Sequence, residues 1–118
     1  MGSKQARVSF VTAFGISSSL RPTAIFAHDD YIGMLALGVL ARLGLRVPED
    51  VSLIAPGDVL DYSRWYVPQI TTMRINTTSL GKLACNLFFD RLRNNIEDIH
   101  VLKLKQQLVR RGTCARPR

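Results

Sequence analysis

The sequence predicts an α/β fold in which a Rossmann-like parallel sheet is flanked by helices. Residues 23–28 and 51–55 are short apolar runs without alternation, which is typical of parallel strands buried on both faces. Between them, apolar residues recur at helical spacing over residues 32–43. A strand, a helix and a second strand in this order form a βαβ unit, whose crossover is almost always right-handed.

The first strand leads directly into Asp29 and Asp30, and either carboxylate can accept backbone N–H groups at the start of the following helix. Gly44 comes just after the last apolar residue of the helical pattern, so we expect it to end the helix as the C′ residue. The side chains predicted to face the sheet share this helical spacing. They are Ile32, Leu35, Ala36, Val39, Leu40 and Leu43.

Further elements are expected after the second strand, which closes at Pro56-Gly57-Asp58. Residues 59–69 are predicted to form an irregular loop, and residues 70–75 a third strand. A helix then starts at Asn76 or Thr77 and carries apolar residues at helical spacing as far as Leu92. Residues 99–109 alternate in part between apolar and basic side chains, which predicts one or two more strands.

The charge distribution argues against a nucleic-acid-binding surface in this chain, although the net charge is +7 over 118 residues. Residues 21–60 carry three arginines against five acids, and the positive excess lies in residues 96–118. A charge run at a chain end is usually a solvated tail, and no aromatic residues interleave with these cations. No apolar stretch approaches the roughly 20 residues that a membrane-crossing helix needs.

The residues typical of catalytic or metal sites do not form a constellation. Cys85 and Cys114 make neither a disulfide framework nor a metal cluster, and His28 and His100 lie in separate strand-like runs. There is no nucleophile elbow and no phosphate-cradling glycine loop. We therefore expect no enzymatic activity, no cofactor and no metal, and a reducing cytoplasm as the location.

Several motifs of the sequence resemble those of a known family. Pro22 to Asp30 gives Pro-Thr-Ala, an apolar strand and an acidic strand end, and Gly44 to Ser52 gives Gly-Leu-x-Val-Pro-x-Asp-Val-Ser. With Pro-Gln-Ile-Thr-Thr at residues 68–72 and Leu-Gly at 80–81, this order resembles the effector domain of lactose, galactose and purine repressors. The match covers roughly residues 22–115, and such a combination would seldom arise by chance.

The resemblance divides the chain into a tag-like or irregular segment over residues 1–21, part of an effector-binding domain over residues 22–115, and a basic tail over residues 116–118. It implies two lobes of the periplasmic binding protein type I fold, with a small effector held between them. The chain is too short for both lobes, so we expect the C-terminal part of such a domain. In the family, the helix near residues 77–94 crosses over to the other lobe.

The function implied by the resemblance is effector sensing and dimerisation within a transcriptional repressor whose DNA contacts come from a helix-turn-helix domain absent from this chain. The alternative is part of a periplasmic sugar-binding protein of a transport system. Lys4 and Arg7 before the mostly apolar residues 8–16 imitate a secretion signal, but an A-x-A-like cleavage site is missing. The reading frame upstream of Met1 would separate the two hypotheses.

Asp29 and Asp58 are the candidate effector-binding residues, because the resemblance places polar side chains at these two strand ends. Ligands of open α/β sheets bind beyond the carboxyl ends of the strands, and a carboxylate can accept hydrogen bonds from vicinal hydroxyls. The alternatives are that Asp29 or Asp30 only caps the helix and that Asp58 is a turn residue. His28 is read as a packed strand residue. Ala-Pro-Gly-Asp at residues 55–58 departs from the family's Gly-Phe-Asp-Asp, so no sugar preference follows.

A homodimer is expected because the helix over residues 32–43 has apolar residues on both faces, and a helix of this kind is buried on both sides. The resemblance places this helix and the loop over residues 63–67 at a two-fold contact. The interface residues predicted are Met34, Leu37, Ala41, Trp65 and Tyr66. The alternative is that the loop folds back and covers this helix face within one chain.

Overall fold

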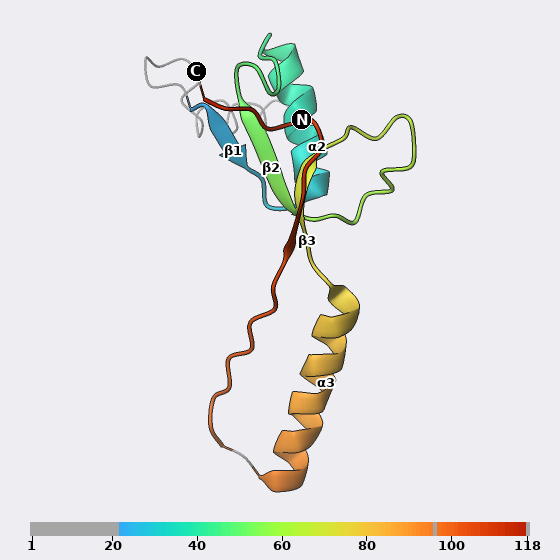
Figure 1. The fold of residues 1–118 in the computed structure, drawn as a ribbon, viewed down its shortest axis with the longest axis vertical. Helices are drawn as coiled ribbons and strands as arrows, with labels where there is room; N and C mark the ends of the chain where they lie inside the picture. The colour runs from blue at the N-terminus through green and yellow to red at the C-terminus, as the bar shows by residue number, and fades with distance from the viewer. Residues whose placement is uncertain (1–21, 96, 118) are drawn as a thin grey trace, which may run out of the picture.

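The computed structural model describes residues 22–95 and 97–117, which form a four-stranded sheet with the strand order β1-β2-β3-β4. The elements are β1 (Ala24–Phe26), α2 (Asp30–Arg42), β2 (Ser52–Gly57), β3 (Thr71–Arg74), α3 (Thr77–Asn94) and β4 (Gln107–Val109). β1, β2 and β3 are parallel, and β4 is antiparallel to β3. α2 lies against the sheet, whereas α3 extends away from it as part of an arm (Figure 1).

The hydrophobic core lies between α2 and the sheet. Leu53 and Ala55 of β2 are fully buried, as is Ile70 immediately before β3, and Ala36 and Leu40 of α2 pack against them. The α/β prediction is confirmed. Leu53 and Ala55 of the apolar run at 51–55 are fully buried, but β1 is buried on one face only, because Ile25 is 5% exposed whereas Phe26 is 68% exposed. The prediction of burial on both faces is therefore wrong for β1.

Both ends of α2 are capped by the residues expected from the sequence. The Oδ1 atom of Asp29 accepts the backbone N–H of Ile32 at 2.8 Å. At the other end Gly44 has a φ of 72°, its N–H donates to the carbonyl of Ala41, and the N–H of Leu45 donates to that of Leu40. This is a Schellman motif, and its two hydrogen bonds satisfy carbonyls that the helix itself leaves open.

The face that α2 turns to the sheet differs from the predicted stripe. Ile32 and Leu35 are 43% and 62% exposed, whereas Gly33, Ala36 and Leu40 are buried. A Cβ atom at Gly33 would lie 3.4 Å from side-chain atoms of Leu53 and Ile70. The stripe prediction is confirmed for Ala36 and Leu40 and wrong for Ile32 and Leu35, because small residues such as Gly33 allow the helix to approach the sheet closely on the buried side.

The arm comprises α3 and the segment that returns from it to β4, and Figure 1 shows it protruding beyond the sheet. α3 has the predicted bounds, but its described residues include no buried one. The strand predicted over residues 99–109 is confirmed only for Gln107–Val109, where β3 provides a hydrogen-bonding partner. Within the described residues, no helix is long and apolar enough to cross a membrane.

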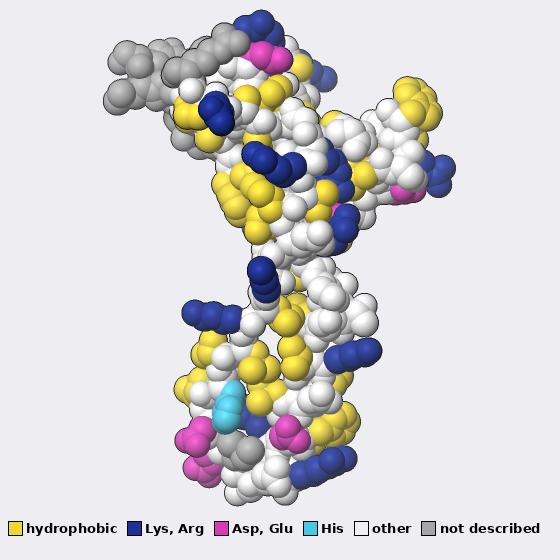
Figure 2. All heavy atoms as spheres, in the orientation of Figure 1, with side chains coloured by type: hydrophobic (Ala, Val, Ile, Leu, Met, Phe, Trp, Pro, Cys, Tyr) yellow, Lys and Arg dark blue, Asp and Glu magenta, His cyan; other side chains and the backbone are white. Residues whose placement is uncertain are grey.

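Figure 2 shows hydrophobic side chains along the arm, between α3 and the returning segment. Exposed apolar residues of the arm include Leu80, Phe88, Phe89, Leu92, Ile99, Val101 and Leu102. This exposure fits the expectation from the resemblance that α3 normally packs against a part of the protein that these residues do not include. The predicted segment at residues 1–21 lies outside the described residues.

Candidate functional site

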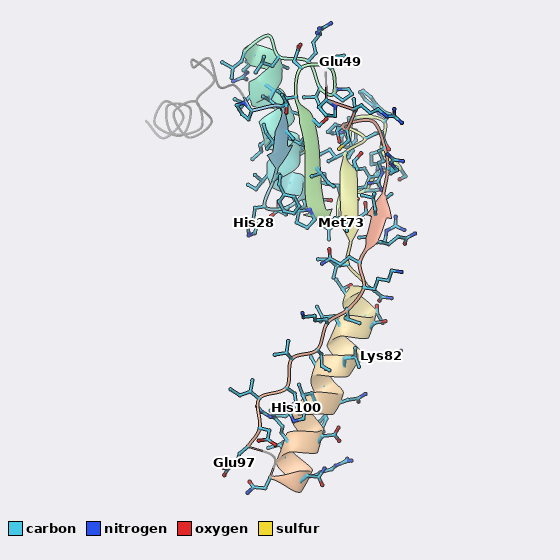
Figure 3. All side chains as sticks on the ribbon, turned by 60° about the vertical axis from the view of Figure 1, so that its left-hand side comes forward. His28, Glu49, Met73, Lys82, Glu97 and His100 are labelled. Atoms are coloured by element: carbon cyan, nitrogen blue, oxygen red, sulfur yellow. The ribbon has the colours of Figure 1, made fainter. Side chains whose placement is uncertain are left out.

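The candidate site lies at the carboxyl ends of the parallel strands, where the arm leaves the sheet. Asp29 follows β1 and Asp58 follows the neighbouring strand β2. Figure 3 shows His28 and Met73 at this end of the sheet and Glu49 at the opposite end. The βαβ topology therefore brings the two predicted acids to the same edge, as the sequence reasoning expected.

Asp29 caps α2 and is also partly open to solvent. Its Oδ1 atom accepts the Ile32 N–H, and its Oδ2 atom lies 3.1 Å from Nδ1 of His28. The hydrogen bond from Ile32, followed by that from His28, lowers the pKa of the Asp29 carboxyl. The side chain remains 37% exposed, so an ionised carboxylate is accessible at this strand end. His28 is itself exposed and is therefore not the packed strand residue that the sequence suggested.

Asp58 is held much more tightly, with a side chain only 4% exposed. Its Oδ1 atom accepts from Thr72 Oγ1 at 2.7 Å and from Arg111 Nη2 at 2.7 Å, and its Oδ2 atom lies 2.5 Å from Arg74 Nε. Burial raises the pKa of this carboxyl, but the hydrogen bonds from Thr72, Arg74 and Arg111 outweigh that effect and leave the pKa lowered. Asp58 is therefore a buried, ionised carboxylate.

The backbone at Asp58 adopts a positive φ of 65° directly after Gly57 at 117°. Aspartate tolerates the left-handed region better than most residues, which explains a turn at this position. The turn aims the carboxylate back toward β3, where Thr72 and Arg74 receive it. The turn-residue alternative for Asp58 is thus correct for its backbone, while its side chain joins the charged cluster.

Asp30 has a role that the sequence reasoning missed. It is fully buried, and its Oδ2 atom accepts the backbone N–H groups of Val59 and Leu60 at 2.8 and 2.9 Å. The hydroxyl of Tyr62 donates to the same oxygen at 3.1 Å. Asp30 therefore anchors the loop that follows Asp58, and the residue that caps the helix is Asp29 rather than Asp30.

Arg111 and Tyr62 complete the cluster, and no local sequence pattern indicates either residue. Arg111 was assigned to a basic stretch near the chain end, yet its side chain is only 12% exposed. Its guanidinium carbon lies 3.6 Å from the centre of the Tyr62 ring, a cation–π arrangement. Burial, followed by the charge of Asp30, raises the pKa of Tyr62, so its hydroxyl stays protonated and able to donate.

The described surface includes a smaller and a larger open depression. The smaller one, of about 390 Å³, adjoins the charged cluster and is lined by Arg74, Ile75, Asn76, Thr77, Lys105 and Gln107. The larger one, of about 550 Å³, is lined by the C-terminal part of α2 and the turn after it, around Glu49 at the opposite end of the sheet. The larger depression is therefore remote from Asp29 and Asp58. No group of residues among those described could hold a metal ion.

Of the five residues predicted for a dimer interface, Ala41 is exposed and the other four fall into two groups. Met34 and Leu37 are partly buried and pack against the core, which the sequence reasoning did not expect. Trp65 and Tyr66 are 94% and 64% exposed, and their rings meet edge to face with centroids 5.7 Å apart. The loop sends Tyr62 onto the core but leaves these two aromatic side chains in solvent.

Comparison with known proteins agrees with this architecture. Residues 3–114 match the periplasmic binding protein-like domain family. The HTH-type transcriptional repressor PurR of Escherichia coli O1:K1 is 38% identical over 100 residues, which is 85% of this chain and 29% of the repressor. The chain thus spans less than a third of the length of this curated relative.

Two solved structures are similar as well. A putative transcriptional regulator LacI from Bacillus cereus subsp. cytotoxis NVH 391-98 superposes with a TM-score of 0.75 at 29% identity, covering 96% of this chain and 39% of that one. A LacI family transcriptional regulator from Enterococcus faecalis V583, with bound ribose, gives a TM-score of 0.68 at 28% identity and covers 98% and 42%. These relatives are regulators rather than transport proteins. The chain belongs to the family of periplasmic binding protein-like domains, and the members that it resembles are transcriptional regulators of the LacI type.

Proposed function

We propose that this chain is the effector-sensing part of a cytoplasmic LacI-type transcriptional regulator and that its effector is a small sugar or a similar polyhydroxyl compound. The observation that carries the proposal is the placement of Asp29 and Asp58 at the carboxyl ends of adjacent parallel strands. Ligands of open parallel sheets bind at this edge, and carboxylates accept hydrogen bonds from sugar hydroxyls. The similar regulator from Enterococcus faecalis was solved with bound ribose.

Because only 4% of the Asp58 side chain is exposed, a ligand can reach its carboxylate only if one of its present partners moves aside. Arg74 is the partner able to do so, because its side chain is 50% exposed whereas that of Arg111 is 12% exposed. A hydroxyl that donates to Oδ2 of Asp58 would take the place of Arg74 Nε and keep the carboxylate hydrogen-bonded. Asp29 needs less rearrangement because it is already partly exposed. The proposal involves no catalytic step, and it assigns DNA contacts to a helix-turn-helix domain that the described residues do not contain.

The test uses ribose as the probe and the melting temperature as the readout. A ligand that binds only the folded chain raises the melting temperature through mass action. We expect ribose or another sugar of a panel to stabilise the parent, and Asp29→Asn and Asp58→Asn to reduce that shift. Asparagine keeps a good helix cap at position 29, so the first variant removes charge and leaves the cap.

Asp61→Asn is the matched control, because Asp61 is an exposed carboxylate in the loop after Asp58, and its side chain contacts Ser63 and Arg64 rather than the charged cluster. Its melting shift with the sugar should equal that of the parent. Equal stabilisation of the parent and the Asp29→Asn, Asp58→Asn double variant would place the site elsewhere. A panel in which no sugar stabilises the parent would contradict effector sensing by this chain.

We also propose that the chain forms a homodimer through Met34, Leu37, Ala41, Trp65 and Tyr66. Support comes from the exposed aromatic pair Trp65 and Tyr66, because large aromatic side chains dominate contacts of this kind. Met34 and Leu37 would contribute only the parts of their side chains that the core leaves open. Sedimentation of the parent and of Trp65→Glu tests this interface. A monomeric parent, or a dimeric Trp65→Glu variant, would show that the interface is wrong.

A further inference from the structure

We propose that Arg111, held in place by Tyr62, is a positioning residue that fixes Oδ1 of Asp58 and leaves Oδ2 available to the effector. The inference rests on the proposed role of Asp58 in effector binding. It assigns functions to two residues that do not lie at a strand end, and it predicts that they act on effector binding only through the carboxylate.

The geometry of the guanidinium carries the first step. Nη1 of Arg111 donates to the carbonyl oxygen of Ile70 at 2.8 Å and to Oγ1 of Thr72 at 2.9 Å, while Nη2 lies 2.7 Å from Oδ1 of Asp58. Because the N–H groups of a guanidinium lie in one rigid plane, contacts with three different acceptors define its orientation as well as its position. The backbone N–H of Arg111 adds a bond to Thr71 Oγ1 at 3.1 Å.

Tyr62 provides the second step, because its ring lies over the face of the guanidinium, whereas the hydrogen bonds are made by the N–H groups at its edge. The ring lies 3.6 Å from the guanidinium carbon of Arg111, and its hydroxyl is tied to the buried carboxylate of Asp30 at 3.1 Å. Asp30 also anchors the backbone of the loop at Val59 and Leu60. A continuous series of contacts therefore runs from Asp30 through Tyr62 and Arg111 to Asp58.

The two arginines on Asp58 differ in a way that indicates a division of roles. Arg111 binds Oδ1 and is nearly buried, whereas Arg74 binds Oδ2 and is half exposed. If both served only to balance charge, one buried cation would be enough for one carboxylate. The arrangement instead fixes one oxygen to the protein interior and covers the other with a side chain that solvent can reach.

The experiment uses NMR on the whole chain, without any effector. It measures the pKa of the Asp58 carboxyl and the rotation of the Arg111 guanidinium. The ¹³Cγ signal of Asp58 reports its pKa, and the ¹⁵Nη signals of Arg111 report whether rotation of the guanidinium is hindered. We expect hindered rotation in the parent and rapid averaging in Tyr62→Leu. We also expect the pKa of Asp58 to rise in Tyr62→Leu, although the hydroxyl of Tyr62 donates to Asp30 and not to Asp58.

Conservative variants separate positioning from charge. Arg111→Lys keeps the positive charge but cannot donate to Ile70, Thr72 and Asp58 from one rigid plane. We therefore expect it to raise the pKa of Asp58 as Tyr62→Leu does. Tyr62→Phe keeps the ring and loses the hydroxyl, so it should give a smaller rise. Arg110→Lys, at the exposed neighbouring position, should change neither signal.

Two results would overturn the proposal in chains that keep the parent's backbone amide spectrum. One is free rotation of the Arg111 guanidinium in the parent; the other is a parent-like pKa of Asp58 in both Arg111→Lys and Tyr62→Leu. Because these measurements need no effector, they are independent of the sugar experiment. If Arg111→Lys also abolishes a sugar-induced melting shift that Arg110→Lys retains, positioning and effector binding are both supported.

Discussion

The two helices of this chain have similar sequence patterns and opposite surroundings. α2 and α3 both begin with a polar cap and both carry apolar residues at helical spacing. α2 buries Gly33, Ala36 and Leu40 against the sheet, whereas the described residues of α3 include no buried one. Periodicity therefore predicts a helix and an apolar face, but the presence of a packing partner decides whether that face contributes to stability.

The largest difference in the free energy of unfolding is expected when a leucine is replaced by alanine in each of the two helices. Leu40→Ala removes a core side chain that is 1% exposed, and it should lower the free energy of unfolding by about 2–5 kcal/mol. Leu92→Ala, at a position 65% exposed on α3, should change it by no more than about 0.5 kcal/mol. Urea unfolding measures both. Equal costs would mean that α3 is packed in solution, for instance against a second copy of the chain.

The two helices can also be compared at one glycine in each, Gly33 in α2 and Gly81 in α3. Gly33→Leu inserts a side chain at a position where even an added Cβ atom would lie 3.4 Å from Leu53 and Ile70, so overpacking should cost about 1–3 kcal/mol. Gly81→Leu places the same side chain on α3, where nothing lies within 4 Å, and its better helix propensity should be neutral or favourable. The melting temperatures of the two variants test both expectations. A destabilised Gly81→Leu variant would show that this side of α3 is covered.

Lowering the pH should weaken the charged cluster around Asp58 more than it affects the arm. The folded-state pKa of Asp58 is lowered, so in acid the unfolded chain binds more protons than the folded chain. The stabilisation is therefore complete above the unfolded-state pKa, about 4, and is lost as the pH falls through the lower folded-state value. Asp58→Asn should cost more stability at neutral pH than in acid.

The control for this measurement is Asp90→Asn, a carboxylate on the exposed surface of α3. It should change the urea midpoint little at neutral pH or in acid. If Asp58→Asn costs the same at both pH values, the ion pairs with Arg74 and Arg111 do not contribute to the stability of the folded chain.

The smallest effect concerns the two helix caps, whose capping hydrogen bonds have nearly the same length. Asp29 accepts the Ile32 N–H at 2.8 Å, and Asn76 accepts the Ser79 N–H at 2.9 Å. Asp29→Ala should lower the free energy of global unfolding by about 1 kcal/mol. Asn76→Ala should leave that energy unchanged and instead speed amide hydrogen exchange at the start of α3, because an unpacked helix frays locally. Equal effects of both caps on global unfolding would show that α3 unfolds together with the core.

Much of the fold could be predicted because its signals are local. The apolar runs around Ile25 and Leu53, the cap at Asp29 and the C′ glycine at position 44 each depend on a few adjacent residues. The edge of the sheet that carries Asp29 and Asp58 followed from the order of a βαβ unit. The strand at residues 99–109 was overestimated, because alternation alone does not provide a neighbouring strand for pairing.

The candidate site was predicted only in part, for the same reason. From the sequence alone we could predict that acidic residues follow two neighbouring strands, because the order of the strands and the positions of the acids can both be read along the chain. The hydrogen bond from Tyr62 to the buried Asp30 and the ion pair between Arg111 and Asp58 became apparent only in the folded structure. These partners are separated by tens of residues, and a basic residue near a chain end looks the same in sequence whether it is solvated or buried. The physical reason is that the pairing energy of a charge depends on burial and on distances in space, which no local pattern contains.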